Sequence, residues 1–558
     1  MSYVQFYQPG VPADIDLPKQ SLLELVDKAA RQNGHKVALE FFGKTTTYRQ
    51  LHDEIERAAQ GLLDLGVRPG DRVALILPNC PQHVIAFYAI LRIQAIVVEH
   101  NPLYTARELR HMFEDHTARV AICWDKAVAK LQDQPDDITL DHIVSVNLLH
   151  SFPTVKRLAL GLPVPSLRAT RRQLTARTCG TVPWSKLLRR PFANPHVPWP
   201  DVNSTAVIQY TSGTTGRPKG AMLSHSNLYS DALMGEVWMH GAKTGQETFY
   251  GVLPMFHAFG MTLLSVFAIL KQARLVLFPN FDPDQVLSVV KKRPPTVFCA
   301  VPPIYDALAR RATERKISLR SAKFCLCGGM ALSSDIAQRW EALAGGLLVE
   351  GYGLTESSPV ALGNPFHPSR RRGTIGLPFP STEIKVVEID DPSREVARGD
   401  RGELLVRGPQ VFRGYWNNPE ATDQALLPGG WLRTGDIVTQ DADGFTTVVD
   451  RLKELIITNG FNVAPSEVEQ VLRLHPDIAD TAVVGLPDQS SGEIVTAVVV
   501  TRPGSTIDEA QVRDFCRERL ARYKVPRRVV TIENLPKSML GKVLRRQIRD
   551  DLVSLAGR

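Results

Sequence analysis

Residues 37–77 read VALEFFGKTTTYRQLHDEIERAAQGLLDLGVRPGDRVALIL, and their apolar residues follow two different periods. Val37–Phe41 is a short apolar run typical of a strand, whereas Tyr48–Leu65 has its apolar residues at helical spacing. The turn-forming residues of Arg68–Asp71 end this helix, and Arg72–Leu77 is another short apolar run, typical of a buried strand. Because strand and helix signals keep alternating, we predict an α/β fold with a parallel sheet.

Farther along the chain the pattern changes. From Gly373 to Asp450, short strand-like runs alternate with glycine-containing turns, which predicts a smaller β-rich subdomain. The residues after Asp450 predict a compact α+β unit. Its expected helices are Ser466–Leu474 and Glu509–Leu520, and its expected strands are Thr481–Val484 and Val495–Val500.

The composition is that of an ordinary globular protein. Hydrophobic residues make up 44% of the 558 residues and charged residues 22%, which excludes a disordered or fibrous chain. No apolar stretch reaches the roughly 18 uninterrupted residues of a membrane-spanning helix, and the N-terminus lacks a secretory signal pattern. The seven cysteines are few and odd in number, so we expect reduced thiols in a cytoplasmic protein.

The positive charge is concentrated in one segment. The formal net charge is +8, and the span from His142 to Pro200 has no Asp or Glu but nine Lys and Arg residues. We expect a long surface insertion here, over residues 154–190. Such a block either binds an anionic lipid surface or is a solvated loop. We expect no nucleic-acid partner, because no nucleic-acid-binding motif accompanies the block.

The strongest local feature is Tyr210–Gly220, YTSGTTGRPKG, which follows the apolar run Ala206–Ile208. Its glycines let backbone amides approach an anion closely, its Ser and Thr residues add hydroxyl donors, and Lys219 adds a cation. It differs from the Walker pattern, because no Ser or Thr follows Lys219. The run predicts a phosphate-binding loop, with a flexible surface loop as the alternative.

A second candidate is Gly351–Glu356, GYGLTE. The ring of Tyr352 between two glycines can present its face to a flat base such as adenine. Thr355 and Glu356 follow closely, and a carboxylate oxygen suits Mg²⁺. The alternative is a turn with a packed tyrosine.

Two further segments lie toward the C-terminus. Trp431–Asp436 ends in an aspartate that can accept both hydroxyls of a ribose, and Arg451 adds a cation in the same region. In Leu535–Arg546, Gly541 permits a tight turn that exposes Lys542. Taken alone, each feature is explained equally well by charges that face solvent.

In this order, the four motifs resemble those of the adenylate-forming superfamily of acyl-CoA synthetases, luciferases and peptide-synthetase adenylation domains. The resemblance covers about Leu22 to Asp550, nearly the whole chain. Within the superfamily, the chain is similar to bacterial long-chain fatty-acid–CoA ligases. The runs that carry this likeness are Asn101–Thr105 (NPLYT), Ala221–His225 (AMLSH), Leu377–Glu383 (LPFPSTE) and Tyr523–Pro526 (YKVP).

The resemblance implies a role for each motif. Residues 211–220 would hold the ATP phosphates, residues 351–356 would hold adenine, the α-phosphate and Mg²⁺, and Asp436 with Arg451 would bind ribose. His257 would line the acyl site near the carboxylate, and Lys542 would act during adenylation. The implied catalytic residues are Lys542, Thr355, Glu356, His257 and Lys219, with Glu356 as the metal ligand. The implied cofactor-binding residues are Thr211, Ser212, Gly213, Thr214, Thr215, Gly216, Lys219, Gly328, Gly329, Gly351, Tyr352, Gly353, Thr355, Asp436, Arg451, Gly460, Phe461 and Asn462.

The resemblance also implies the reaction and the domains. We expect ligation of a medium- or long-chain fatty acid to CoA through an acyl-adenylate, with ATP, Mg²⁺ and CoA. The expected N-terminal domain spans 1–450, the hinge 451–454 and a mobile C-terminal domain 455–558. The alternatives are a fatty-acyl-AMP ligase that loads a carrier protein, an aryl-acid–CoA ligase, and a non-catalytic nucleotide- or fatty-acid-binding protein.

The acyl pocket and the membrane are less directly indicated. We expect Phe256–Phe259, Val301–Ile304 and Cys327–Met330 to line the pocket, where Gly328 and Gly329 leave room for a deep tunnel. The basic insertion is longer than the resemblance implies. We therefore expect the protein to associate peripherally with anionic lipid at the inner face of the membrane.

Overall fold

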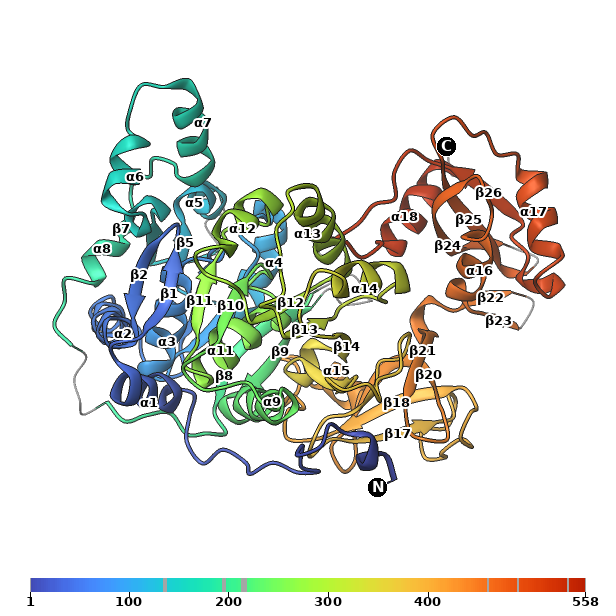
Figure 1. Ribbon diagram of the computed structural model, residues 1–558, viewed down its shortest axis with the longest axis horizontal. Helices are drawn as coiled ribbons and strands as arrows, with labels where there is room; N and C mark the ends of the chain where they lie inside the picture. The colour runs from blue at the N-terminus through green and yellow to red at the C-terminus, as the bar shows by residue number, and fades with distance from the viewer. Residues whose placement is uncertain are drawn as a thin grey trace. The chain divides into compact units, whose positions relative to one another are not determined.

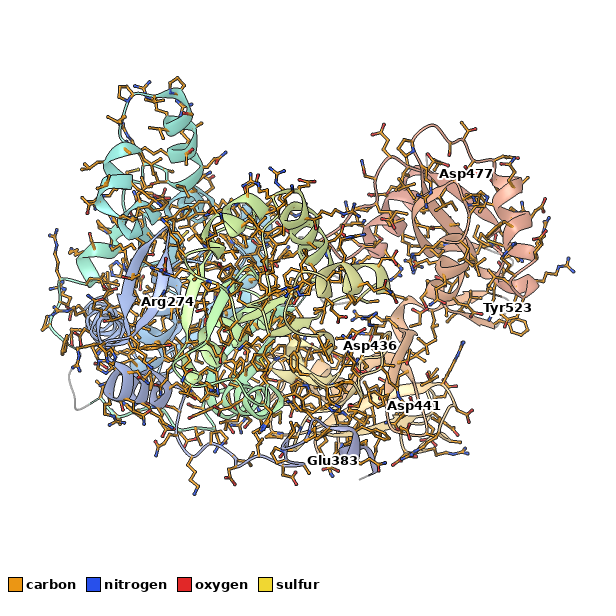
Figure 2. All side chains as sticks on the ribbon, in the orientation of Figure 1. Arg274, Glu383, Asp436, Asp441, Asp477 and Tyr523 are labelled. Atoms are coloured by element: carbon orange, nitrogen blue, oxygen red, sulfur yellow. The ribbon has the colours of Figure 1, made fainter. Side chains whose placement is uncertain are left out.

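The computed structural model describes residues 2–133, 138–192, 197–211, 218–458, 461–488, 491–538 and 541–556 (Figures 1 and 2). Contacts between residues divide the chain into two compact units. The first contains Tyr3–Glu383 and Val406–Leu432, and the second contains Ile384–Leu405 and Arg433–Arg558. The sequence predicted a boundary near residue 450, and the hinge expected at residues 451–454 stays a prediction.

The first unit contains a seven-stranded sheet in the order β7-β6-β5-β3-β4-β8-β9. All neighbouring strands in it are parallel except β8 and β9, which are antiparallel. The predicted α/β fold with parallel sheet is therefore confirmed. The strands are β3 (Arg72–Ile76), β4 (Ile96–Glu99), β5 (Val120–Trp124), β6 (His142–Val146), β7 (Val182–Pro183), β8 (Thr205–Thr211) and β9 (Lys219–Ser224).

A nine-stranded sheet forms the second layer, in the order β16-β15-β14-β13-β12-β10-β11-β1-β2. Its middle strands, from β14 to β1, are parallel, and antiparallel strands stand at both edges. The strands are β1 (Val37–Phe41), β2 (Lys44–Thr47), β10 (Thr248–Gly251), β11 (Arg274–Leu277), β12 (Val297–Ala300), β13 (Phe324–Cys327), β14 (Leu348–Gly353), β15 (Val360–Gly363) and β16 (Leu377–Pro378).

Helix α3 (Pro81–Arg92) lies where the two sheets meet. Every one of its residues is buried, because the helix contacts β1 in one sheet and β3 and β4 in the other. This position explains the long apolar run of this helix. Among the described residues, no helix is both long and apolar enough to cross a membrane.

Helix α2 (Tyr48–Asp64) confirms the helix predicted from residue 48. The Thr47 hydroxyl accepts a hydrogen bond from the Gln50 N–H, and the Gln50 side chain accepts one from the Thr47 N–H. Such a capping box contributes about 1 kcal/mol. The other main helices of this unit are α1 (Leu23–Asn33), α4 (Ala106–His116), α5 (Val128–Gln132), α9 (His225–Trp238), α12 (Pro283–Val290), α13 (Pro302–Glu314), α14 (Ser334–Glu341) and α15 (Pro419–Ala425).

The basic insertion has more regular structure than a loop. It contains α6 (Thr154–Ala159), α7 (Pro165–Leu174), the edge strand β7 and α8 (Trp184–Leu187). The buried side chains of Leu174, Trp184 and Leu187 anchor it to the first unit. Figure 1 shows α6 and α7 extending beyond the end of the sheet at which β7 lies.

The second unit holds two smaller sheets, one of which also includes residues of the first unit, among them 426–427 and 431–432. One has the order β17-β18-β20-β19, with β21 paired to β20; the other has the order β23-β22-β25-β24, with β26 paired to β25. The predicted β-rich subdomain and the α+β unit are both present. Their elements are β17 (Glu383–Val387), β18 (Gly402–Arg407), β19 (Leu426–Leu427), β20 (Trp431–Gln440), β21 (Thr446–Arg451), β22 (Ile456–Thr458), β23 (Phe461–Val463), β24 (Ile478–Asp488), β25 (Gly492–Thr501), β26 (Arg528–Thr531), α16 (Pro465–Leu472), α17 (Glu509–Arg517) and α18 (Arg545–Ala556).

Candidate active site

The predicted phosphate loop connects two antiparallel strands. β8 ends at Thr211 and β9 begins at Lys219, and these two residues face each other in the ladder. The Thr211 hydroxyl lies 3.5 Å from the carbonyl oxygen of Lys219. Five predicted site residues, Ser212, Gly213, Thr214, Thr215 and Gly216, lie outside the described residues.

The GYGLTE motif stands at the carboxyl end of β14, in the mainly parallel sheet. Ligands in open α/β sheets bind at this end of the strands. Tyr352 is half-buried on β14, and Thr355 and Glu356 are half-buried in the short 3-10 helix η5 (Thr355–Ser357) that follows. A Cβ at Gly353 would lie 1.6 Å from the Pro359 carbonyl oxygen, so only glycine fits there.

Tyr415 joins the two motifs, and the sequence analysis missed it. Its hydroxyl donates to Oε1 of Glu356 at 2.7 Å, and Nζ of Lys219 lies 5.2 Å from the centre of its ring. Burial and the Glu356 carboxylate raise the pKa of Tyr415, so the hydroxyl keeps its proton and donates. A tyrosine after Gly414 was visible in the sequence, but nothing local connected it to Glu356.

Tyr415 is positioned by backbone pairing with β9. Its backbone forms an antiparallel bridge with Ala221, and the N–H of Trp416 donates to the Gly220 carbonyl at 2.7 Å. The segment that carries Tyr415 therefore lies beside the strand that begins at Lys219. As a result, the cation of Lys219, the carboxylate of Glu356 and the phenol of Tyr415 lie together, near the start of β9 and the end of β14.

His257 and Gly328 bring the predicted acyl site next to this motif. His257 caps the short helix α10 (Ala258–Gly260), with its Nδ1 accepting from the Phe259 N–H at 3.4 Å. Its ring reaches solvent but is surrounded by protein on most sides, and this desolvation lowers the pKa of the imidazole. Gly328 is buried; a Cβ there would lie 3.0 Å from the Phe259 ring and 3.4 Å from the Gly351 carbonyl oxygen. Gly329 follows it with φ +78°, a conformation that favours glycine.

In the second unit, the structure brings Asp436, Arg451 and Lys542 together. Asp436 and Arg451 face each other across β20 and β21, with Arg451 Nε 2.9 Å from Asp436 Oδ1. Lys542 is within electrostatic range of both. Burial and the neighbouring Arg451 lower its pKa, whereas Glu454 and Asp436 oppose that shift. Three residues separated by as many as 106 positions in the sequence therefore lie close together in space.

The Lys542 loop has the tight turn that the sequence predicted, but Lys542 is half-buried and not exposed as expected. Gly541 has φ +81°, and the Ser538 N–H donates to the Lys542 carbonyl at 2.7 Å. Arg545 follows the loop and binds Glu469 at 2.9 Å and also Glu454. This network ties the loop to α16 and to the residues after β21.

The expected thiol-channel residues are only partly described. Phe461 opens β23, and its ring is stacked on Tyr523 at 4.6 Å between centroids. Phe461 remains 53% exposed, which leaves one face of this aromatic pair open to solvent. The backbone of Asn462 pairs with Ile457, and Gly460 lies outside the described residues.

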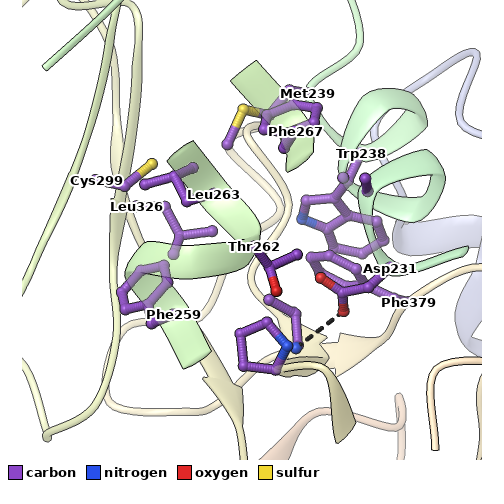
Figure 3. Close-up of a pocket in the computed structure, with 14 residues that line it drawn as sticks. Asp231, Trp238, Met239, Phe259, Thr262, Leu263, Phe267, Cys299, Leu326 and Phe379 are labelled. Atoms are coloured by element: carbon purple, nitrogen blue, oxygen red, sulfur yellow. Dashed lines mark hydrogen bonds between the residues drawn. The ribbon is translucent and has the colours of Figure 1, made fainter. Parts of the chain in front are cut away.

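An apolar cavity lies inside the first unit (Figure 3). Its volume, counted together with the open solvent at its mouth, is about 460 Å³. Its walls come from α9, from the π-helix η4 (Met261–Phe267) and from β12, β13 and β15. The lining residues include Asp231, Trp238, Phe259, Thr262, Leu326 and Phe379.

The expected pocket residues are only partly among these walls. Phe259 lines the cavity as predicted, but Val301–Ile304 and Cys327–Met330 do not. The sequence analysis missed α9 and η4 altogether. Because α9 is apolar on several sides, its sequence gave no sign of which residues would face a cavity.

The chain belongs to the AMP-binding enzymes. The model of the family described as "AMP-binding enzyme" matches residues 26–416, and "AMP-binding enzyme C-terminal domain" matches residues 467–542. Membership in this family confirms the superfamily resemblance drawn from the motifs.

Its individual relatives act on different acids, as their names say. A long-chain-fatty-acid–CoA ligase of Bacillus subtilis (strain 168) is 36% identical over 550 residues, covering 98% of this chain and 97% of the relative. A feruloyl-CoA synthase of an Amycolatopsis species is 35% identical, covering 94% and 97%. The crystal structure of ATP-bound MatB from Rhodopseudomonas palustris has a TM-score of 0.79 at 28% identity, covering 96% and 99%.

Proposed function

We propose that the protein ligates a medium- or long-chain fatty acid to CoA through an acyl-adenylate, releasing pyrophosphate and then AMP. One observation carries the proposal: the apolar cavity adjoins the GYGLTE motif. Phe259 and Leu326 line the cavity, and a Cβ on Gly328 or Gly351 would meet these same two side chains. An alkyl chain in the cavity would place its carboxylate near Thr355 and Glu356.

The first half-reaction is the attack of the carboxylate oxygen on the α-phosphate of ATP. A new oxygen–phosphorus bond forms and pyrophosphate leaves with the bonding electrons. Negative charge grows on phosphate oxygens, so cations positioned in advance lower the barrier. By the family resemblance, Lys219 and Lys542 would supply such cations, Tyr352 would lie against adenine, and Asp436 with Arg451 would bind the ribose.

Glu356 is suited to hold Mg²⁺. Its carboxylate is half-buried and directed by the Tyr415 hydroxyl at 2.7 Å. No group of three or more His, Cys, Asp or Glu side chains that could hold a metal ion exists in the part of the chain that the structure describes. One carboxylate together with substrate phosphates is a usual way to bind Mg²⁺ in such sites. The bound ion would neutralise phosphate charge.

The second half-reaction transfers the acyl group from AMP to a thiol. The CoA sulfur attacks the acyl carbon, and AMP leaves with its phosphate oxygen. The pantetheine arm of CoA needs a path to the acyl carbon that Lys542 does not block. Rotation of residues 455–558 about the hinge at 451–454 would replace the Lys542 loop by Gly460, Phe461 and Asn462.

Acid-dependent exchange of ATP and pyrophosphate, measured with and without CoA, tests this function. Fatty acids of roughly 8 to 18 carbons should support exchange, and CoA should convert it to AMP release. If only aryl acids support exchange, the protein is an aryl-acid–CoA ligase, with the kind of substrate named for the feruloyl-CoA synthase. AMP release that needs a carrier protein instead of CoA would identify a fatty-acyl-AMP ligase.

We also propose that α6 and α7 bind an anionic membrane surface. α6 has no buried side chain, and Val155, Leu158 and Leu162 are 79%, 67% and 52% exposed. Exposed apolar residues among cations are typical of segments that lie in a membrane interface. The accompanying cations are Lys156, Arg157, Arg168, Arg171 and Arg172, with no acidic residue between His142 and Pro200.

A further inference from the structure

One wall of the apolar cavity carries a buried carboxyl group, that of Asp231. Its side chain belongs to α9, and the residue is 4% exposed. Oδ1 accepts a hydrogen bond from the Val360 N–H at 3.0 Å. Figure 3 shows this bond, with the carboxyl group among the cavity-lining side chains.

The hydrogen bond from the Val360 N–H to Oδ1 is the one recorded for the Asp231 carboxyl group in the described part of the chain. The contacts that shift its titration are burial and the Val360 N–H alone, so no basic side chain compensates its charge. Burial without a counter-ion raises the pKa of the carboxyl group well above its ordinary value. A neutral carboxyl group presents both a hydrogen-bond donor and an acceptor to the cavity.

The other polar side chains of the cavity wall are already engaged. The Thr262 hydroxyl donates to the Ser358 carbonyl at 2.8 Å, and the Trp238 indole N–H donates to the Asn364 carbonyl at 3.1 Å. An unsubstituted alkyl chain beside Asp231 would leave the second oxygen of its carboxyl group without a hydrogen bond, and a buried polar atom in that state is costly.

We propose that Asp231 selects acids that carry a hydroxyl group on the acyl chain. This inference rests on the proposed function, because it takes the cavity to be the acyl pocket. A hydroxyl accepts a hydrogen bond from the carboxyl O–H and donates one to its oxygen, so both groups are satisfied. Sites built to hydrogen-bond a substrate hydroxyl discriminate strongly against the analogue that lacks it.

Two other occupants would satisfy the carboxyl group differently. An ammonium on the chain would pair with the ionised form. An ordered water would pair with either form, and would let plain alkyl chains bind without a penalty. The substrate panel therefore includes a saturated acid, its positional monohydroxy isomers and an ω-amino acid, all of one chain length.

The measured quantity is the ratio of kcat/KM for each substituted acid to that of the plain acid. Wild-type protein should prefer one hydroxy isomer by about 10- to 100-fold, since the loss of one buried hydrogen bond has that effect. Asp231→Leu should abolish the preference. Asp231→Asn should keep part of it, because the amide still accepts from Val360 and directs N–H donors into the cavity.

Thr262→Val is the matched control, because it removes a hydroxyl group from the same wall that is already bonded to Ser358. It should leave the ratio unchanged. Folding defects affect both acids of a pair equally and cancel in the ratio. A wild-type ratio of one or below for every hydroxy isomer, or an unchanged ratio in Asp231→Leu, would overturn the proposal. A ratio near one would point to a bound water. Preference for the ω-amino acid would overturn it in favour of an ammonium. If no acid supports AMP formation, the proposed function fails instead.

Discussion

The Tyr415 hydroxyl donates a hydrogen bond of 2.7 Å to Oε1 of Glu356, although the two residues are 59 positions apart. The same ring lies beneath Nζ of Lys219. One side chain thus contacts both the expected metal ligand and an expected phosphate-binding cation. Tyr415 therefore directs the Glu356 carboxylate and lies against the Lys219 ammonium.

Tyr415→Phe should weaken the binding of Mg²⁺ more than it weakens the binding of the acid. Residues that orient a metal ligand typically contribute 10- to 100-fold to metal affinity or activity. We expect the Mg²⁺ concentration for half-maximal ATP–pyrophosphate exchange to rise about tenfold. Tyr229→Phe is the control, because Tyr229 donates to Glu24 at 3.2 Å in another part of the unit. An unchanged Mg²⁺ curve for Tyr415→Phe would show that Glu356 does not depend on it.

Lys542→Ala should separate the two half-reactions. Its charge is needed while the α-phosphate is attacked, and loss of one such contact typically costs about 10²–10³ in rate. ATP–pyrophosphate exchange should collapse, whereas thioester formation from supplied acyl-AMP and CoA should persist. Lys537→Ala, which removes a surface ion pair with Asp480 in the same segment, is the control. Equal damage to both steps would contradict a two-conformation mechanism.

Trp238 should limit the length of the acyl chain. Figure 3 shows Trp238 and Phe259 on opposite sides of the cavity. The Trp238 ring stacks on Phe379 at 4.4 Å and meets Tyr7 edge-on at 4.9 Å, so three aromatic rings close that side.

Trp238→Ala should therefore shift the preferred chain length upward. Each additional methylene group that the enlarged cavity can bury should raise kcat/KM by about tenfold or more. Because Trp→Ala in a core costs roughly 3–5 kcal/mol of stability, Phe379→Leu serves as a milder second variant. Activity on the shortest accepted acid is the internal control. Equal losses at every chain length in both variants would show that this wall does not contact the chain end.

Reversing the charges of α7 should release the protein from anionic vesicles. Attraction to an anionic surface is about 1 kcal/mol for each nearby basic residue, and salt screens it. The triple variant Arg168→Glu, Arg171→Glu, Arg172→Glu should lose more than roughly 10²-fold in vesicle binding at low salt. Reversal of the exposed Lys291 and Lys292 after α12 is the control.

The exposed apolar residues of α6 make a separate contribution. Leu158→Asp should reduce the binding that remains at high salt, because apolar insertion is not screened by ions. If wild-type protein sediments with neither neutral nor anionic vesicles, the insertion is only a solvated segment. Equal sedimentation with both would show that its cations do not contribute.

The buried pair His100 and His116 should make the first unit acid-sensitive. Their Nε2 atoms are 3.1 Å apart, and the Ala118 N–H donates to Nδ1 of His116. Burial lowers the pKa of His100 to about 3 and that of His116 well below its ordinary value. The unfolded chain takes up protons on both below about pH 6.5, whereas the folded chain does not. The free energy of unfolding therefore decreases as the pH is lowered below about 6.5, by up to about 1.4 kcal/mol per pH unit for each histidine.

His100→Gln should flatten this dependence. The drop in apparent Tm between pH 7 and pH 5 should be smaller than in wild-type protein, even if the variant is less stable at pH 7. His111→Gln is the control, because His111 lies on the exposed side of the same helix as His116. A drop in Tm as steep as that of wild-type protein would show that His100 is not protonated on unfolding in this range.

The sequence alone determined the elements whose signals are local. β1 and the start of α2 lie at the predicted residues, because strand and helix periods are written in neighbouring side chains. The four motifs indicated the family for the same reason: each is a short run whose chemistry is legible without its surroundings. The resemblance implied that Asp436 and Arg451 act together, and the structure pairs their side chains; that Lys542 lies near both came from the structure.

Only the tertiary structure decided which side chains from distant segments touch. Tyr415 reaches Glu356 because its segment pairs with β9, and no local pattern encodes that pairing. Asp231 looks like an ordinary polar residue in its helix, and it becomes a chemical feature of the cavity because η4 and β15 bury it. Periodicity states which face of a helix is apolar, but the packing of several elements at once determines which residues line a cavity and which polar atoms lose water.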